Sequence, residues 1–403
     1  MRTAPAELAM TRWAGWVDRV WAWRDRLIAS PVFQRRAAAF AITRPVARRQ
    51  ARALFDLVAG FVYSQVLLAC VELRLFDVLA EGPQTLERLA HRLALAPEAA
   101  QRLLDAAVAL RLVARRGAGR YGLGELGAPM VGNTAVAAMV KHHAALYADL
   151  ADPVALLRAN PAQRRGNALA RYWDYGSGRG SGHGSDHGRD NGSVDADAGA
   201  DAGPMSAAYT ELMAASQPLV ADEILDAYDL SRHHCLLDVG GGDGRFLSTV
   251  AQRALSLRLQ LFDLPAVAAR AAARFEAAAL AGRAQTFGGS FLNDALPRGA
   301  DVASLVRVIH DHDDAAALAI LRAVHAALPP GGTLLLAEPM AGAKGAEAMG
   351  DAYFGFYLLA MGRGRPRRAE VLTQLLSSAG FDSVRNLPTR LPLQTGLLVA
   401  RRS

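Results

Sequence analysis

CLLDVGGGDGRFL, residues 235–247, is the stretch of this sequence that decides the fold. Its first residues are mostly apolar, as in a buried β-strand, and they run directly into a turn that holds four glycines. Glycine suits a tight turn and the close approach of a ligand, because it has no side chain and adopts positive φ without strain. The residues from Arg245 onward begin a helix pattern. The stretch therefore predicts a strand, a ligand-binding turn and a helix in succession.

The spacing of the glycines distinguishes two kinds of nucleotide site. A turn that binds a nicotinamide dinucleotide has the pattern G-x-G-x-x-G, but counted from Gly240 and Gly242 the third position is Arg245. The pattern D-x-G-x-G-x-G, from Asp238 to Gly244, is instead typical of S-adenosylmethionine sites. The turn alone is a weak signal, so a second feature is needed.

Asp263 supplies that second feature. It ends the next apolar stretch, LQLFDLP, 19 residues after Gly244 (263 − 244). A carboxylate at this distance can accept hydrogen bonds from both hydroxyls of a ribose. The alternative for Asp263 is a helix N-cap before Pro265.

Strand and helix patterns alternate around the glycine turn. A helix is expected at Tyr209–Tyr228, and strands at Cys235–Val239, Leu257–Asp263, Asp301–Val308 and Thr333–Glu338. Strands separated by helical stretches of about ten or more residues are typical of a parallel sheet with helices on both faces. We therefore predict an α/β fold with a Rossmann-like, mostly parallel sheet in residues 205–403.

A third polar feature follows the third of these strands, in LVRVIHDHDD, residues 305–314. Open parallel sheets bind ligands at the carboxyl edge of their strands, and His310 at that edge can take a hydroxyl proton near neutral pH. His310, His312 and Asp314 also fit the metal pattern H-x-H-x-D. The histidine that would complete that pattern is Ala315, and a metal site would leave the glycine turn unexplained. We predict a general base at His310 and no metal.

The first 50 residues form an arginine-rich arm. Trp13, Trp16, Trp21 and Trp23 are spaced so that several share one side of a helix. This composition is typical of a helix at a membrane surface, and a helix that packs across a dimer partner explains it equally well. Both interpretations are kept.

Residues 51–174 are expected to form a helical domain. An apolar helix is predicted at Phe55–Leu79, an N-cap at Thr85, a helix start at Pro97 and a hairpin at Arg115–Gly122. Helix, helix and hairpin in this order resemble a winged helix-turn-helix. The polar side of the last helix mixes acids with arginine and lacks the basic face that DNA recognition needs, which favours dimerisation over DNA binding.

Residues 175–204 are expected to separate the helical domain from the sheet domain. They are rich in glycine, serine and aspartate and nearly devoid of large apolar groups, so burial cannot compensate for the entropy lost on ordering. We predict a flexible linker whose His183 and His187 are solvated rather than bound to a metal.

Length and composition limit the class of protein. A chain of 403 residues with 52% hydrophobic residues suits two folded domains. The formal charge of +7 comes from arginine throughout the chain, and no aromatic-plus-basic RNA-binding pattern accompanies it, so nucleic acid is not an expected partner. Cys70 and Cys235 lie far apart in apolar surroundings, as in a reducing cytoplasm. Residues 1–10 hold no apolar signal region, and the apolar stretch Leu54–Phe76 is interrupted by charges, so no membrane crossing is expected.

Four motifs together resemble one known family. LLDVGGGDG, FDLP, VIHDHDD and LPPGGTLLLAEP follow an apolar helical domain, as in the hydroxyl-directed small-molecule O-methyltransferases, which include the plant caffeate and isoflavone enzymes and the acetylserotonin-like enzymes. The likeness covers roughly Phe55 to the C-terminus. SPVFQRRAAAFAITRPVARRQARALFDLVAGFVYSQVLLACVELRLFDVLAEGP and ELMAASQPLVADEILDAY are most similar to bacterial members that methylate a carotenoid hydroxyl.

The resemblance implies S-adenosylmethionine as cofactor, a homodimer, and an apolar hydroxylated acceptor, with a carotenoid as the first expectation. A phenolic or polyketide acceptor is the alternative within the family. A ligand-sensing winged-helix regulator is the alternative outside it. Localisation is expected to be cytoplasmic, with peripheral contact to a membrane if the arm serves that purpose.

The resemblance also implies roles for particular residues. His310 would be the base and Glu338 would brace it. Two positions depart from the family, because Ser290 stands where an acid is usual and Pro366 where a second bracing glutamate is expected. The support of His310 thus rests on Glu338, on Asp311 or on neither. The residues implied to bind the cofactor are Asp238, Gly240, Gly242, Gly244, Asp263, Leu264, Ser290, Phe291 and Arg307.

A carotenoid acceptor needs a long apolar pocket. Large side chains at helical spacing in the segment after Glu338 are candidates to line it, together with one methionine from the helix before the sheet. Core or dimer packing explains the same spacing equally well. The candidates are Met213, Met349, Tyr353, Phe354, Tyr357, Leu358 and Met361.

Overall fold

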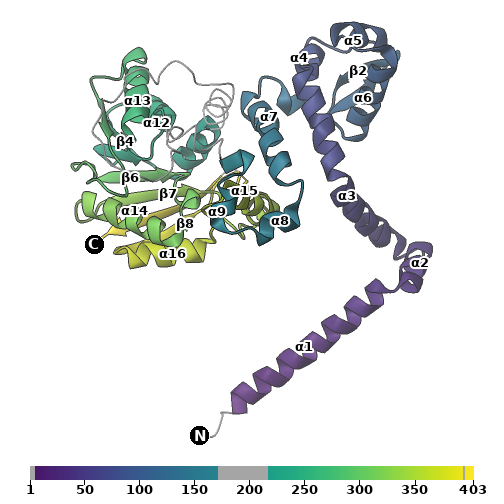
Figure 1. The fold of residues 1–403 in the computed structure, drawn as a ribbon, viewed down its shortest axis with the longest axis horizontal. Coiled ribbons are helices and arrows are strands. Elements are labelled where there is room, and N and C mark those ends of the chain that lie inside the picture. Colours follow the sequence, from purple (N-terminus) through teal and green to yellow (C-terminus); the bar gives the residue numbers. More distant parts are fainter. Residues whose placement is uncertain (1–4, 171–216, 394) are drawn as a thin grey trace, which may run out of the picture. The chain divides into compact units, whose positions relative to one another are not determined.

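The computed structural model describes residues 5–170, 217–393 and 395–403, with side chains described from residue 15 onward. The chain divides into two compact units, Met1–Val131 and Gly132–Ser403 (Figure 1). The sequence predicts that the helical domain extends to residue 174, whereas the first compact unit ends at Val131. The predicted linker, residues 175–204, lies outside the described residues. Each unit is described by itself.

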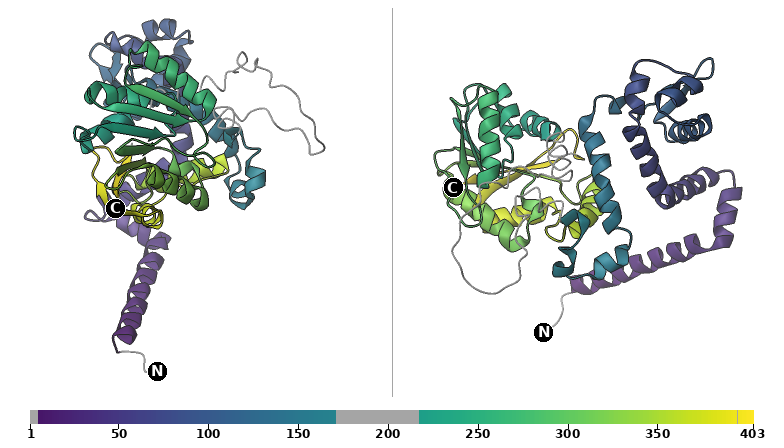
Figure 2. Two further views of the ribbon diagram at one scale, coloured as in Figure 1. Left: turned by 90° about the vertical axis from the view of Figure 1, so that its left-hand side faces the viewer. Right: turned by 45° about the horizontal axis from the view of Figure 1, so that its top comes forward.

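The first unit is helical and contains one hairpin. Thr85 caps its helix as predicted, since its hydroxyl accepts the N–H of Arg88 at 3.4 Å, and Pro97 opens the next helix. The two short strands pair antiparallel from Val113 opposite Leu123 to Arg116 opposite Arg120. Figure 2 shows the first three helices as separate rods joined by short connections. The elements are α1 (Pro5–Ala29), α2 (Pro31–Ala39), α3 (Arg44–Glu72), α4 (Leu75–Ala80), α5 (Leu86–Arg92), α6 (Pro97–Ala109), β1 (Val113–Arg116), β2 (Arg120–Leu123) and the 3₁₀ turn Ala128–Met130.

The predicted single helix Phe55–Leu79 is wrong in its bounds. The structure has the longer α3, which begins at Arg44, and then a break before α4. At the break, Arg74 takes the left-handed conformation with φ of 53°. The chain changes direction here, and Leu75 and Phe76 at the start of α4 are buried. In one continuous helix these two residues would instead extend α3 along its axis.

Helix α3 leaves most of its apolar surface exposed. Leu57 is 81% exposed, and Phe55, Val58 and Phe61 are exposed as well. In the described part of the chain, α3 alone meets the length and hydropathy criteria of a membrane-crossing helix, with 11% of its most apolar window buried. No such helix was expected from the sequence, because isolated polar residues interrupt the stretch. The mean hydropathy over an 18-residue window of α3 is nevertheless high, at 1.9, because a few polar residues lower it only slightly.

The second unit contains a seven-stranded sheet in the order β5-β4-β3-β6-β7-β9-β8. Strands β3 to β7 run parallel, whereas β9 is antiparallel to β7 and to β8. From β3 the next two strands of the chain, β4 and β5, are added on one side of the sheet, and β6 and β7 are added on the other. At such a change of direction, the carboxyl ends of the two adjacent strands, here β3 and β6, are where open parallel sheets bind ligands. The strands are β3 (Cys235–Val239), β4 (Arg258–Asp263), β5 (Ala284–Gly288), β6 (Val302–Val306), β7 (Thr333–Glu338), β8 (Phe381–Leu387) and β9 (Gly396–Arg402).

Alternate residues of the buried strands face two separate hydrophobic clusters. Leu237, for example, belongs to the cluster with α14 and α16, and its neighbour Leu236 to the cluster with α12 and α13. Figure 1 shows these helix pairs on opposite sides of the strands. Both faces are therefore covered, as the strand and helix pattern predicted. The helices are α12 (Arg245–Arg253), α13 (Pro265–Ala277), α14 (Asp314–Ala327) and α16 (Ala369–Ser378), and a further helix is described at residues 217–227.

The strand predictions hold for β3 and β7 and fail in part elsewhere. The predicted strand Asp301–Val308 ends at Val306, because Arg307 adopts φ of 59° and turns the chain out of the sheet. Strands β5, β8 and β9 were not predicted. Two of them, β5 and β8, lie at the sheet's edges and carry exposed residues, so the apolar run that marks a central strand is missing.

Short helices preceding residue 171 belong to the second unit. They are α7 (Thr134–Asp149), α8 (Pro153–Arg158) and α9 (Pro161–Arg164). Leu146 of α7 and Leu156 of α8 share a hydrophobic cluster with α15 (Gly355–Met361), which follows the π-helix Ala348–Phe354. This shared core explains why the compact unit begins at residue 132.

Candidate active site

The glycine turn lies between β3 and α12 and is held by two hydrogen bonds that its backbone N–H groups donate. The N–H of Gly240 donates to the carbonyl of Phe262 at 2.8 Å, and that of Gly242 donates to Asp263 Oδ2 at 2.8 Å. Gly240, Gly242 and Gly244 all have positive φ, between 60° and 81°. A Cβ on Gly240 would lie 2.8 Å from Val308, whereas a Cβ on Gly242 would meet nothing within 4 Å. The turn therefore needs glycine, and it leaves open space at Gly242.

Asp263 ends β4 and faces the glycine turn. Its second oxygen, Oδ1, accepts the N–H of Leu264 at 2.7 Å. Burial raises the pKa of Asp263, and the hydrogen bonds from Gly242 and Leu264 act in the opposite direction. Leu264, not Asp263, is the N-cap residue of α13, so the alternative function as a helix cap does not describe this carboxylate.

The segment after β5 approaches the same turn. The ring of Phe291 lies 3.6 Å from the position of a Cβ on Gly240, and it packs edge-on against His312 with centroids 5.5 Å apart. The N–H of Ser290 donates to Asp294 Oδ2 at 2.8 Å. An acid is thus present beside Ser290, four residues later in the chain, although the position itself lacks the acid usual in the family.

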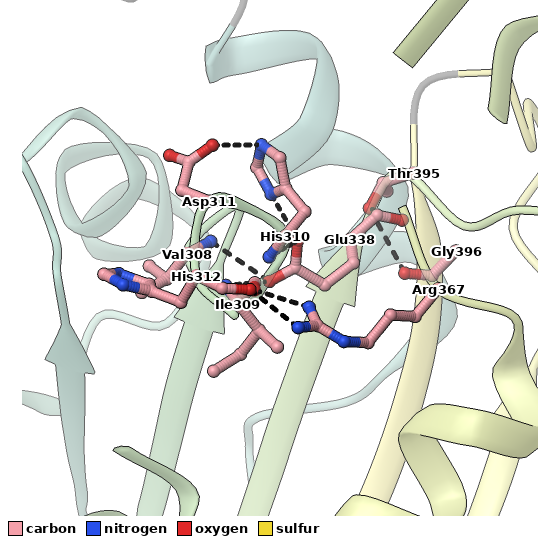
Figure 3. Close-up of polar contacts among 9 residues, drawn as sticks. All are labelled: Val308, Ile309, His310, Asp311, His312, Glu338, Arg367, Thr395 and Gly396. Atoms are coloured by element: carbon pink, nitrogen blue, oxygen red, sulfur yellow. Dashed lines mark hydrogen bonds and ion pairs between the residues drawn. The ribbon is translucent and has the colours of Figure 1, made fainter. Parts of the chain in front are cut away.

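His310 lies in a 3₁₀ turn, Ile309–Asp311, that follows β6 (Figure 3). Its Nδ1 is 2.6 Å from Oε2 of Glu338, the last residue of β7, and both side chains are buried. The Glu338 carboxylate also accepts the N–H groups of Val308 at 3.0 Å and of Ile309 at 2.7 Å. The predicted pairing of His310 with Glu338 is thus present in the structure.

Two carboxylates act on His310 from opposite sides of its ring. Asp311 Oδ1 lies 3.1 Å from Nε2, as an ion pair rather than as an aligned hydrogen bond. Burial alone would lower the pKa of His310, but Asp311 and Glu338 outweigh it and raise the pKa above 6.5, against a smaller opposing effect of Arg307. The two carboxylates therefore make His310 a stronger base than an ordinary imidazole.

His312 and Asp314 do not join His310 in a metal site. Among the described residues there is no group of three histidine, cysteine or acidic side chains that could hold a metal ion. The ring of His312 points away from that of His310 in Figure 3, and Asp314 instead pairs with Arg365 and Arg367.

An aromatic cluster lies beside His310. The ring of Phe354 packs edge-on against it with centroids 6.1 Å apart, and Tyr353 and Tyr357 stack on each other at 5.8 Å. His143 Nε2 is 2.8 Å from the hydroxyl of Tyr353, and His142 Nε2 is 2.8 Å from that of Tyr357. Sequence analysis missed both histidines, whose only signal was the pair itself in α7.

The histidines and Tyr353 in this cluster are neutral near pH 7. Burial, with a contribution from His143, lowers the pKa of His142 to about 4, and burial lowers that of His143. Burial raises the pKa of Tyr353 to about 12. The cluster thus offers hydroxyl and imidazole groups without charge beside the ring of His310.

The remaining pocket candidates are placed differently. Tyr357, Leu358 and Met361 are buried in the cluster with α7 and α8. Met349 is half-buried in the π-helix. Met213 lies outside the described residues.

Comparisons with known proteins match both parts of the chain. A family model for the O-methyltransferase domain matches residues 186–382, and one for the O-methyltransferase dimerisation domain matches residues 55–139. Demethylspheroidene O-methyltransferase of Cereibacter sphaeroides is 42% identical over 94% of this chain and 94% of its own length. Acetylserotonin O-methyltransferase of Mus musculus is 33% identical over 84% of this chain and 85% of its own. The chain belongs to the S-adenosylmethionine-dependent O-methyltransferase family.

Solved structures agree with the fold of this methyltransferase. CalO1, a methyltransferase in calicheamicin biosynthesis, in its SAH-bound form, superimposes with a TM-score of 0.70 at 25% identity. The superposition covers 88% of this chain and 98% of CalO1. The second unit therefore has the class I methyltransferase fold, and the first holds most of the match to the family's dimerisation domain, residues 55–131 of 55–139.

The glycine turn of the methyltransferase fits its cofactor, S-adenosylmethionine. Asp238 is 1% exposed, with Oδ1 accepting the hydroxyl of Ser304 at 2.7 Å. Its Oδ2 has no hydrogen-bond partner among the described residues. Burial raises the pKa of Asp238 to about 7. A buried carboxylate below an open glycine turn is suited to a cationic ligand, which would restore its charge.

Proposed function

We propose that this methyltransferase transfers a methyl group from S-adenosylmethionine to the tertiary 1-hydroxyl of an acyclic hydroxycarotenoid of the demethylspheroidene type. The observation that carries the proposal is the 42% identity to demethylspheroidene O-methyltransferase over nearly the full length of both chains. A second relative of that name, from Rhodobacter capsulatus, is also 42% identical and supports the same acceptor.

The cofactor supplies an activated methyl group, so the chain's main tasks are to position the acceptor and to remove a proton. A tertiary alcohol is a far weaker acid than imidazolium, whose ordinary pKa is about 6.5, so free alkoxide does not accumulate. His310 therefore takes the hydroxyl proton as the new carbon–oxygen bond forms. Its Nδ1 is held by Glu338, which leaves Nε2 for the acceptor once Asp311 moves aside.

The cofactor would be held around the glycine turn. Asp263 would accept the ribose hydroxyls with the lone pairs that Gly242 and Leu264 leave free, since each carboxylate oxygen accepts two hydrogen bonds. Phe291 beside Gly240 would contact the adenine, next to Ser290, and Arg307 would lie at the end of β6 nearest the reacting groups.

Tyr353 and Phe354 would line the acceptor's side of the site. Both are half-buried: Phe354 packs against His310 and Tyr353 packs against Phe354. Met349 lies in the same π-helix. Uncharged aromatic walls favour a polyene, because no charge loses its hydration when the acceptor binds.

Incubation of the purified chain with methyl-labelled cofactor and a panel of acceptors tests the proposal. The panel holds demethylspheroidene and 1-hydroxyneurosporene in detergent micelles, together with soluble phenols and indoles. Label in the carotenoid fraction, at a kcat/KM well above that of any phenol, is the expected result. A preference for a soluble phenol would assign the chain to another acceptor within its family.

We further propose that two copies pair through α3. Most of its exposed large apolar side chains, from Phe55 to Val62, lie within the match to the dimerisation domain, which begins at residue 55. Burying several large side chains such as Leu57 and Phe61 contributes about 1.5–3 kcal/mol each, which suits a permanent homodimer.

Ahead of α3, α1 is proposed to bind an anionic membrane surface, from which a water-insoluble acceptor can be collected. Trp16, Trp21 and Trp23 are exposed, and so are the nearby Arg19, Arg24 and Arg26. The Arg24 guanidinium lies 4.1 Å from the ring centre of Trp21. Indole rings at headgroup depth with cations toward anionic lipid are typical of interfacial helices. The demethylspheroidene relative matches 94% of this chain, so its alignment extends into the segment that precedes residue 55.

Flotation with anionic vesicles separates membrane binding from dimer packing. We expect the full chain to float and to be released as salt screens the attraction. Replacing Trp16, Trp21 and Trp23 by glutamine should abolish flotation, whereas glutamine at Leu391 and Leu393, exposed in the other unit, should not. If the wild type stays in the soluble fraction and the tryptophan variant loses its dimer, the arm is an assembly element instead.

A further inference from the structure

A buried arginine contacts the turn that carries His310. The side chain of Arg367 is 1% exposed. It donates to the carbonyls of Ile309 at 2.8 Å and of His312 at 2.6 Å (Figure 3). Through Nε it also donates to Asp314 Oδ1 at 2.9 Å. No sequence pattern indicated this arrangement, because an arginine in an arginine-rich segment is normally exposed.

The turn receives opposite charges at its two ends. A 3₁₀ turn leaves N–H groups unpaired at its start and carbonyls unpaired at its end. Glu338 accepts the N–H groups of Val308 and Ile309 at the start. Arg367 donates to the carbonyl of His312, just after the turn, and to that of Ile309, which also accepts the N–H of His312. A negative group at the start and a positive group at the end also complement the dipole of the turn.

The backbone just before Pro366 adds to the contact. The N–H of Arg365 donates to the carbonyl of His310 at 2.9 Å. A Cβ on Gly364 would lie 2.1 Å from that same carbonyl oxygen, so only glycine permits the approach. The segment that lacks the second bracing glutamate therefore lies directly against the backbone of His310.

We propose that Arg367 is a positioning residue that holds the turn of His310 from its carbonyl side, in place of the second bracing glutamate that this chain lacks at Pro366. The inference rests on the proposed role of His310 as the base. Unlike a carboxylate brace, Arg367 acts on the backbone of the turn, and the imidazole keeps its hydrogen bond to Glu338 and its ion pair with Asp311.

The geometry of guanidinium is what the role requires. Its planar fork donates to Ile309, His312 and Asp314 at once, whereas the ammonium of lysine is a single point charge on a flexible stem. Arg367→Lys therefore keeps the charge and loosens the turn. Arg368→Met is the matched control, since the neighbouring arginine is exposed and contacts Asp351 instead.

The first measurement uses the chain without cofactor or acceptor. NMR titration of the His310 ring, assigned with His310→Gln, should give a lower pKa in Arg367→Lys than in the wild type. The charge is unchanged, so the shift reports a weaker contact with Glu338. The pKa in Arg368→Met should equal that of the wild type.

The second measurement is turnover. A displacement of about 1 Å costs up to about a hundredfold in rate, so Arg367→Lys should lower kcat at least about tenfold with KM for the cofactor nearly unchanged. Arg367→Met, which lacks both charge and fork, should lose more, and if it does not fold, the lysine variant decides alone. An unchanged His310 titration in Arg367→Lys, or a kcat equal to that of Arg368→Met, would overturn the proposal. If the wild type itself ignores carotenoids, the proposed function fails while the titration still tests the positioning role.

Discussion

Glu338→Gln is the substitution that separates the charge of the brace from its shape. Glutamine keeps the size of glutamate and one acceptor oxygen, so Val308 and Ile309 can still donate to it. Its amide nitrogen then stands where Oε2 accepts from His310 Nδ1 at 2.6 Å and from the His310 N–H at 3.4 Å. Two donors face each other in a buried site, and the ion pair is lost.

The magnitude follows from these contacts. A hydrogen bond to a charged group contributes about 1.5–3 kcal/mol, and an unsatisfied buried donor costs about 1–3 kcal/mol. Glutamine is neutral, so the cost of burying the charge of Glu338 disappears, and this offsets part of the loss. We expect the free energy of unfolding to fall by about 2–4 kcal/mol below pH 6.5.

The pH dependence has a definite sign. The pKa of His310 is raised above its unfolded value of 6.5, so the stabilisation by imidazolium is fully present below pH 6.5. It is lost as the pH rises through the raised folded pKa. The difference in stability between wild type and Glu338→Gln should therefore shrink toward high pH, where only the backbone contacts of the carboxylate remain.

Chemical denaturation at a series of pH values measures this difference, with Glu276→Gln, an exposed glutamate in α13, as the control. The same variant should move the acid limb of the kcat/KM profile to lower pH and lower kcat at every pH, because the ring is no longer oriented. A stability difference that stays constant from pH 5 to 9 would refute the assignment of the raised pKa to this pair.

Three further predictions concern the cofactor, the base and the metal interpretation. Gly242→Val should abolish cofactor binding by filling the open space at the turn, and Asp263→Ala should weaken it by about 1.5–3 kcal/mol; unchanged affinity of both variants in calorimetry would remove the site from the glycine turn. His310→Ala should leave cofactor affinity nearly intact and lower turnover about a hundredfold or more, so methylation at the wild-type rate would make His310 structural. Exhaustive chelation should leave wild-type activity unchanged, and loss of activity would revive the metal interpretation of His310, His312 and Asp314.

The β3 region was predictable because its information is local. An apolar strand, a glycine turn and an acid at the end of the next strand lie within 29 residues, 235–263, and all three recur in the structure. His310 and Glu338 were paired through the family resemblance, and their strands prove to be neighbours in the sheet. The length of α3 and the break at Arg74 were not predictable in this way, since a turn of left-handed backbone at arginine has no sequence signature.

The sequence by itself determined the chemistry that is available: a glycine turn that adopts positive φ, acids at strand ends, a histidine after the third predicted strand and an apolar pattern that covers both faces of a sheet. Only the tertiary structure decided how these groups act on one another. Burial raises the pKa of Asp238, two carboxylates raise that of His310, and His142 and His143 reach the aromatic cluster from α7, more than 200 residues earlier in the chain. The function of Arg367 also appears only in three dimensions, because hydrogen bonds to backbone carbonyls depend on where the chain lies and not on which residues flank the arginine.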